Sequence, residues 1–237
     1  MYADHLVTCP FMQGNERTIT HAAVVKFCDA LNHAAHIPSL IEPRGPFVAS
    51  DEIIQPNGHV IMERRYLDLW SGDGHLRPDG TGTLADVTGF HAMANAVYDN
   101  QDIDVTALLS QRVRLKNAKY HNAVNRIGYN FLPLVFESYS GLLHKDFVDF
   151  ISKRSRIIAT RLGIRPAVIL RNWLSRLSCI LRRMLALTVM NRLDRLLSIQ
   201  HGPLCHDIDQ VLQLQQPLVV YDLGLMVQEC VVDDGGT

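Results

Sequence analysis

The chain has 237 residues, 47% of them hydrophobic, which is enough to bury a full core and favours one α/β domain with an appended helical region. Its apolar runs are short and broken by charge, and the N-terminal residues MYADHLVTCP lack the positive start and apolar stretch of a signal peptide, so membrane spans and export are not expected. The five cysteines are odd in number and irregularly spaced, so we expect an intracellular chain without a disulfide framework.

The net charge of −1 hides a strongly basic segment. Residues 151–197 hold 11 Lys and Arg against the single acid Asp194, whereas residues 198–237 hold six acids and no Lys or Arg. Such a segment suits a polyanion, because each neutralised phosphate releases counterions. The alternative is a pair of amphipathic helices that arginine merely solvates.

In the first part of the chain, apolar residues three positions apart predict a helix over Glu16–His36, ended by Ile37 and Pro38. Residues 39–63 are expected to form extended pieces around the turn at 55–58. A loop rich in Gly and Asp follows at 68–83 and leads into a short strand at 84–88.

Further along, a helix is predicted over Val105–Ile127, ending at Gly128. The continuous apolar run at 131–138 predicts a buried strand, parallel to its neighbour, although it contains a proline. Residues 145–199 have a helical pattern broken near Gly163 and Pro166. This order predicts a mixed central sheet flanked by helices, with no internal repeat.

Two carboxylates and a pair of lysines have the types and spacing that a metal-dependent nuclease needs. Asp79 lies in the sequence Arg-Pro-Asp-Gly, and Asp86 lies in the short strand that follows. Two carboxylates can bind Mg²⁺ through oxygen, and Lys116 or Lys119 on the next helix could stabilise charge on a phosphate. Taken singly, Asp79 also fits a turn residue and the lysines fit a solvated helix face.

The succession RPDG, DVT, K-x-x-KY and FLPLVFESYSG resembles the region that follows the reverse transcriptase in non-LTR retrotransposon proteins. The resemblance covers residues 5–195. Relatives in site-specific elements carry a restriction-enzyme-like endonuclease of the PD-(D/E)XK type, with a Pro-Asp pair, a second Asp and a lysine on the following helix. The resemblance therefore implies that fold, Mg²⁺ or Mn²⁺ at Asp79 and Asp86, and Lys116 as the catalytic lysine with Lys119 as its rival. Glu137, in the strand-end motif, would be a further ligand or a structural acid.

The N-terminus is similar to the second half of the family's Cys-Cys-His-Cys zinc knuckle, through His5 and Cys9. A tetrahedral site needs four ligands, so zinc is expected only if missing ligands come from upstream or from another chain. The resemblance places residue 1 inside a longer polyprotein.

Two departures from the family pattern leave alternatives open. Thr88 stands two residues after Asp86, where an orthodox site has its lysine, so the lysine must come from the helix. If the first carboxylate of the family pattern aligns with an earlier residue than Asp79, that residue is Asp68.

These features together predict a metal-dependent endonuclease of a retroelement, nuclear in location, that nicks target DNA for reverse transcription. The alternatives are an inactive nucleic-acid-binding module and a degenerate fragment. DNA is the expected partner, with RNA and the reverse transcriptase region of the same element as further candidates. The expected organisation is a knuckle remnant at 1–20, a nuclease-like core at 21–150, a basic helical region at 151–199 and an acidic, poorly ordered tail at 200–237. The arginines expected to contact DNA are Arg154, Arg161, Arg171, Arg176, Arg182 and Arg183.

Overall fold

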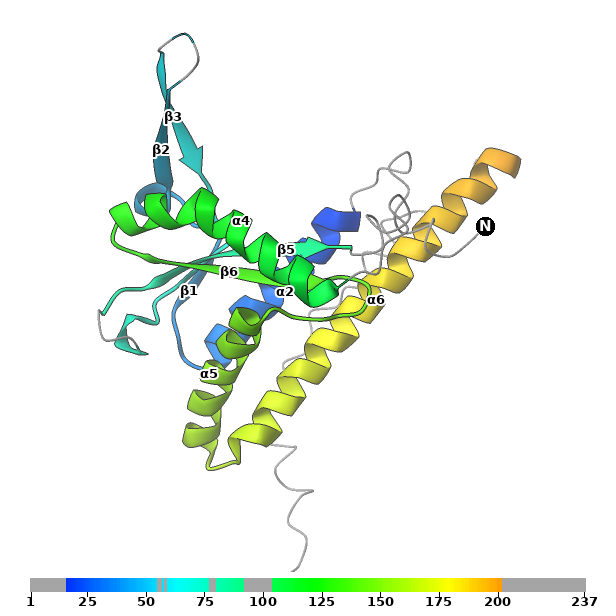
Figure 1. Ribbon diagram of the computed structural model, residues 1–237. Coiled ribbons are helices and arrows are strands. Elements are labelled where there is room, and N and C mark those ends of the chain that lie inside the picture. The colour runs from blue at the N-terminus through cyan, green and yellow to red at the C-terminus, as the bar shows by residue number, and fades with distance from the viewer. Residues whose placement is uncertain (1–15, 55–56, 58, 77–79, 92–103, 202–237) are drawn as a thin grey trace, which may run out of the picture. The chain divides into compact units, whose positions relative to one another are not determined.

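The computed structural model describes residues 16–54, 57, 59–76, 80–91 and 104–201 (Figure 1). Residues 1–193 form one compact unit and residues 194–237 a second, and the fold and site described below belong to the first. The elements in chain order are α2 (Glu16–Ala34), β1 (Ser39–Ile41), the 3-10 turn η1 (Gly45–Phe47), β2 (Ala49–Ile54), β3 (Val60–Arg65), β4 (Leu69–Ser71), η2 (Gly74–Leu76), β5 (Thr83–Phe90), α4 (Val105–Arg126), β6 (Asn130–Glu137), α5 (Lys145–Leu162) and α6 (Pro166–His201).

The main sheet is mixed and has four strands in the order β1-β4-β5-β6. β1 with β4 and β4 with β5 are antiparallel, whereas β5 and β6 are parallel and joined through α4. The expected mixed sheet flanked by helices is therefore confirmed, as is the parallel strand at 130–137. Pro133 is tolerated there because β6 is the edge strand, where one side needs no backbone donor.

β2 and β3 form a separate antiparallel hairpin that projects away from the main sheet (Figure 1). Extended structure was expected in this part of the chain. The projection leaves Val60, Ile61 and Met62 exposed.

Helices cover both faces of the main sheet, and the alternation of side chains along β5 and β6 supplies both cores. Ala85 and Val87 face the larger core, which α2, α5 and α6 complete. Leu84 faces the other side and packs under α4. Asp86 and Thr88 alternate with the residues of the larger core, so β5 turns them toward α4.

The helix ends follow the sequence signals. Gly128 and Gly163 have positive φ, of 80° and 67°, as residues that end a helix often do, and they stop α4 and α5 close to the predicted positions. Asp104 begins α4 by accepting hydrogen bonds from the backbone N–H groups of Thr106 and Ala107.

The basic helices are packed on the sheet. Ile151 and Ile158 of α5, and Trp173 and Leu177 of α6, lie in the same buried cluster as residues of β5 and β6. The boundary expected at residue 150 falls inside α5 (Lys145–Leu162). Among the described residues, no helix combines the length and apolar character needed to span a membrane.

Candidate active site

Asp86 is a buried carboxylate with an ion-pair partner. Its side chain comes from the middle of β5, and the residue is only 6% exposed. Nζ of Lys116, on α4, lies 3.1 Å from Oδ1 and 2.9 Å from Oδ2 of Asp86. The hydroxyl of Thr88 donates a 2.6 Å hydrogen bond to the same Oδ2. Such partners are what a buried charge requires.

Asp68 lies at the bend just before β4, close to Asp86. The next residue, Leu69, pairs with Ala85 of β5, and N–H of Asp68 itself donates to the carbonyl of Ala85 at 3.0 Å. Asp68 and Leu69 therefore lie together opposite Ala85, as in a β-bulge. N–H of Val87 donates to Oδ2 of Asp68 at 2.6 Å. Val87 directly follows Asp86, and both aspartates line the same cavity, so the two carboxylates are neighbours.

His21 of α2 is the second partner of Asp68. Its Nε2 lies 3.1 Å from Oδ2 of Asp68. The hydrogen bond to Asp68 is the main reason that the pKa of His21 is raised above 6.5, and the negative charges of Asp68 and Asp86 add to it. Burial acts in the opposite direction and is outweighed. The pair of acids therefore has one basic side chain on either side, His21 and Lys116.

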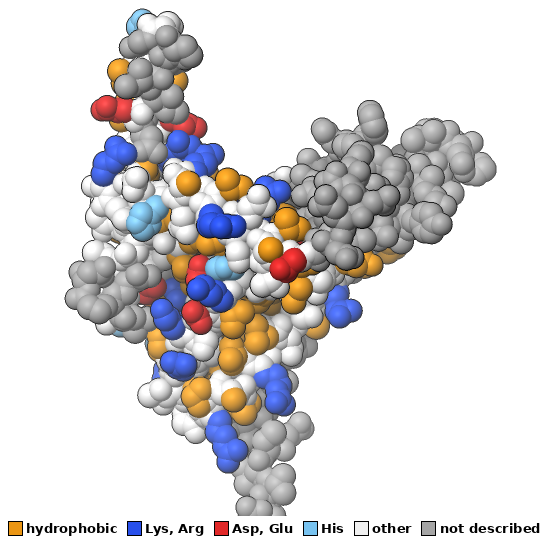
Figure 2. All heavy atoms as spheres, in the orientation of Figure 1, with side chains coloured by type: hydrophobic (Ala, Val, Ile, Leu, Met, Phe, Trp, Pro, Cys, Tyr) orange, Lys and Arg blue, Asp and Glu red, His pale blue; other side chains and the backbone are white. Residues whose placement is uncertain are grey.

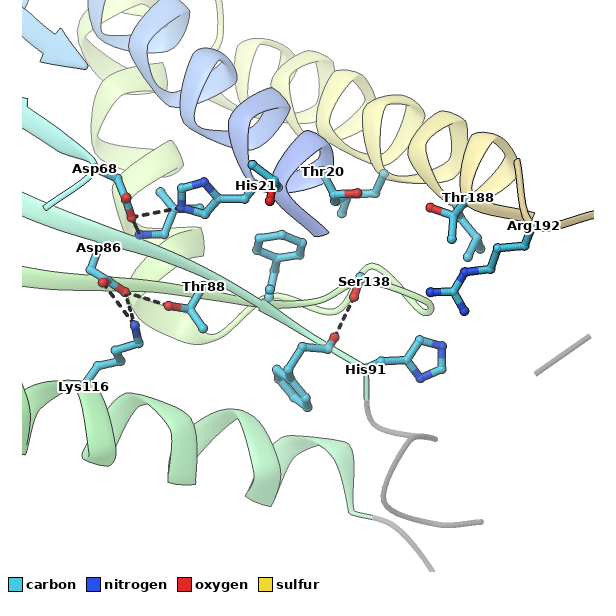
Figure 3. A pocket seen from close by; sticks show the side chains of 17 residues that line it. Thr20, His21, Asp68, Asp86, Thr88, His91, Lys116, Ser138, Thr188 and Arg192 are labelled. Atoms are coloured by element: carbon cyan, nitrogen blue, oxygen red, sulfur yellow. Dashed lines mark hydrogen bonds and ion pairs between the residues drawn. The ribbon is translucent and has the colours of Figure 1, made fainter. Parts of the chain in front are cut away.

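These side chains line a cavity of about 420 Å³ (Figure 3). One end holds Asp68, Asp86 and Lys116, and the walls continue along β5 to His91 and across to α6. Figure 3 shows the guanidinium of Arg192, on α6, directed toward Ser138 and His91 at the other end. The cavity thus presents acids at one end and basic groups along its length.

No family model and no curated protein matches this chain. In the described part of the chain, no group of three or more His, Cys, Asp and Glu side chains is arranged to hold a metal ion. Asp68 and Asp86 still form a suitable oxygen pair, since Mg²⁺ sites often use one or two carboxylates and keep several waters.

Three predicted site residues lie outside the described residues. They are Asp79, His5 and Cys9. Asp68, the alternative first carboxylate, is described and lines the same cavity as Asp86. The structure thus brings together Asp86, Asp68 and Lys116.

The two candidate lysines differ in position. Lys116 lines the cavity and contacts Asp86. Nζ of Lys119 instead lies 5.1 Å from the ring centre of Tyr120, and its side chain is exposed. Lys119 follows Lys116 by three residues, so it lies almost one turn further along α4 and about 60° away around the helix axis.

Glu137 is held in a turn at the end of β6. It is 2% exposed, and its Oε2 accepts hydrogen bonds from N–H of Tyr139 and from N–H and the hydroxyl of Ser140. It does not line the cavity. These contacts match the structural alternative for this acid.

The prediction that Arg154 contacts DNA is wrong, because Arg154 lies in the core. It is 2% exposed, with Nη2 3.0 Å from Oδ2 of Asp73 and Nε 2.6 Å from Oδ1 of Asn32. Its guanidinium also lies 3.6 Å from the ring centre of Phe150. The remaining predicted arginines are exposed or partly exposed, namely Arg161, Arg171, Arg176, Arg182 and Arg183.

Two members of the site carry no sequence signal of their own. The role of His21 depends on its contact with Asp68, 47 positions away in the sequence. Thr88 was noted only because it stands where the family has a lysine, which does not predict its hydrogen bond to Asp86. Alternation in β5 could have suggested Thr88, since residues two apart in a strand share a face.

Proposed function

We propose that this chain is a metal-dependent endonuclease that nicks DNA, the nuclease part of a non-LTR retroelement protein with a restriction-enzyme-like fold. The observation that carries the proposal is the meeting of Asp86, Lys116 and Asp68 at one end of a cavity. An acid on a strand with a lysine on the following helix is the arrangement implied by the resemblance.

Asp68 and Asp86 are the residues that would hold Mg²⁺ or Mn²⁺, because both offer carboxylate oxygens to the same cavity. A bound divalent cation would supply Lewis-acid polarisation of a phosphoryl oxygen and a lower pKa for coordinated water. The other requirements of catalysis, which are positive charge beside the phosphate and correctly oriented carboxylates, are met by side chains of the protein.

Lys116 supplies positive charge beside the reacting phosphate. Its ammonium group is held at Asp86 before substrate enters, and it can turn to a phosphoryl oxygen that gains negative charge in the transition state. Thr88 keeps the Asp86 carboxylate oriented through its hydrogen bond. His21 does the same for Asp68 and adds positive charge at the same end of the cavity.

The experiment is nicking of supercoiled plasmid by the full chain with Mg²⁺ or Mn²⁺. We expect cleavage that falls at least about a hundredfold in Asp86→Asn, a change that keeps shape and removes the charge. Asp149→Asn is the matched control, since Asp149 is an exposed acid on α5 away from this cavity. Equal cleavage by the wild type and Asp86→Asn would contradict the proposal.

A nucleic-acid-binding module without cleavage is the second candidate. The observation that favours it is that Lys116 contacts both oxygens of Asp86, which neutralises the carboxylate without any cation. Retardation of DNA in EDTA, with no nicking in Mg²⁺ or Mn²⁺, would select this function.

A further inference from the structure

The helix that carries Lys116 is itself strongly basic. Residues 105–126 contain five Lys and Arg and no Asp or Glu, and the helix begins after its capping residue Asp104. Arg112, Arg114 and Lys119 are exposed. Basic character was expected on α5 and α6, and the five charges of α4 lie in a part of the chain, residues 1–150, that is acidic as a whole.

Three of these charges share one face of α4. Arg112, Lys119 and Arg126 are spaced seven residues apart, close to two helical turns, so their side chains form a stripe, which we call the α4 stripe. All three are exposed. The stripe is about 21 Å long at 1.5 Å per residue, a length over which one strand of B-DNA carries about six phosphates.

The α4 stripe runs beside the cavity. Lys116 lies within about 40° of Arg112 around the helix axis, at a rotation of about 100° per residue, and it reaches Asp86. The guanidinium of Arg112 lies 5.8 Å from the ring centre of Phe90, which lines the cavity. Figure 2 shows Lys and Arg side chains along α4 and toward the base of the β2–β3 hairpin. A polyanion lying on the stripe would therefore pass over the acids.

The arginines of α6 have a different relation to the cavity. The residues of α6 that line it are Leu181, Leu185, Thr188 and Arg192. Arg182 and Arg183 follow Leu181 by one and two residues, so they are rotated from the cavity-facing side by about 100° and 200°. These charges solvate other faces of α6.

We propose that the phosphate backbone of duplex DNA lies along α4, contacted by Arg112, Lys119 and Arg126, and that α4 is the main DNA-binding element. The inference rests on the proposed action on DNA and adds where the duplex is held. It assigns Lys119 to phosphate binding and leaves Lys116 at the reacting phosphate. Contacts of this kind position the duplex without reading its sequence.

The first test measures duplex binding by fluorescence anisotropy in EDTA over a range of NaCl concentrations, so that cleavage plays no part. The variant R112Q/K119Q/R126Q should lower the slope of log Kd against log salt by about 2.7, at about 0.9 per phosphate contact, and weaken binding on the order of tenfold. The matched variant R171Q/R182Q/R183Q should change the slope by less than about 0.9. An unchanged slope in the α4 variant, or an equal loss in the α6 variant, would overturn the proposal.

A control within α4 separates position from charge. Arg114 is exposed but lies about 200° around the helix from Arg112. Arg112→Gln should reduce the slope by about 0.9, whereas Arg114→Gln should leave it unchanged. Equal effects would mean that only total charge matters, and the stripe would be rejected.

A second measurement uses the unaltered protein and does not depend on how variants fold. Acetylation of lysines is followed by mass spectrometry with and without DNA. Duplex DNA should protect Lys119 and leave Lys145 and Lys153, exposed on α5, reactive. Protection of the α5 lysines alone would overturn the proposal, and stronger protection of Lys119 by single-stranded RNA would overturn the choice of duplex DNA.

These outcomes are separable from failure of the nuclease proposal. Binding in EDTA requires neither Asp86 nor a cation, so an inactive protein can still show the α4 effect. Conversely, nicking that disappears in Asp86→Asn while R112Q/K119Q/R126Q binds normally would support the nuclease and reject the α4 stripe.

Discussion

Lys116 and Asp86, on α4 and β5, form an ion pair in which the lysine nitrogen lies 2.9 Å from one carboxylate oxygen and 3.1 Å from the other. The lysine therefore stands where a divalent cation would also bind. In the proposed nuclease, Lys116 competes with the cation for Asp86. Once substrate is present, the lysine stabilises the negative charge on the reacting phosphate.

Removing this lysine should separate cation binding from catalysis. We expect Lys116→Met to raise the affinity for Mn²⁺ about tenfold, because a nearby positive charge is lost, while nicking falls about a hundredfold or more. Isothermal titration with Mn²⁺ and the plasmid assay measure the two effects. Lys119→Met is the control for Mn²⁺ affinity, which should stay the same. A weaker Mn²⁺ affinity in Lys116→Met would contradict the competition.

The identity of the first carboxylate can be decided by comparing two aspartates. Asp68 lines the cavity beside Asp86, whereas Asp79 belongs to the Pro-Asp pair in the sequence. We expect Asp68→Asn to reduce nicking about a hundredfold and Asp79→Asn to reduce it less than about tenfold. The opposite ranking would restore Asp79 as the metal-binding acid.

The buried pair of Arg154 and Asp73 should be important for stability. Arg154→Met leaves the Asp73 carboxylate in the core without its charged partner, which we expect to lower the free energy of unfolding by roughly 3–5 kcal/mol. Urea denaturation measures this. Arg161→Met, at an exposed position of the same helix, should change stability by no more than about 0.5 kcal/mol. A small effect at Arg154 would show that the core rearranges around Asp73.

His21 should make stability depend on pH when metal is absent. Its folded-state pKa is raised by Asp68, so the protonated form stabilises the fold. This contribution is complete below the unfolded pKa, about 6.5, and is lost as pH rises through the higher folded value. We expect Tm, measured in EDTA, to fall over that range in the wild type relative to His21→Gln. A constant difference between the two proteins across this range would rule out the pair with Asp68.

The elements themselves could be predicted because their signals are local. Apolar residues at helical spacing predicted helices at 16–36 and 105–127, which the structure has at 16–34 and 105–126, and the glycines at 128 and 163 marked helix ends. The apolar run at 131–138 predicted a buried strand, parallel because it is isolated between helices, and the strand is found at 130–137. The β2–β3 hairpin was expected only as extended pieces, since β3 has no buried side chain and therefore no alternation of buried and exposed residues.

Local patterns also identified Asp86 and Lys116 as candidate site residues, but they did not predict that the two side chains are in contact. That contact joins residues 30 positions apart and depends on how α4 is rotated over β5. Asp68 became the neighbour of Asp86 through the backbone just before β4, where N–H of Asp68 donates to Ala85 and N–H of Val87 donates to the Asp68 carboxylate.

The sequence by itself determined the helices, the strands, the charge of each segment and a short set of chemically suitable residues. Only the tertiary structure decided which of those residues share a cavity, that Arg154 is internal, and that the basic face nearest the acids belongs to α4. The physical reason is that hydrophobic period and turn residues act over a few positions, whereas packing fixes the rotation of each helix and the register of each strand across the whole domain.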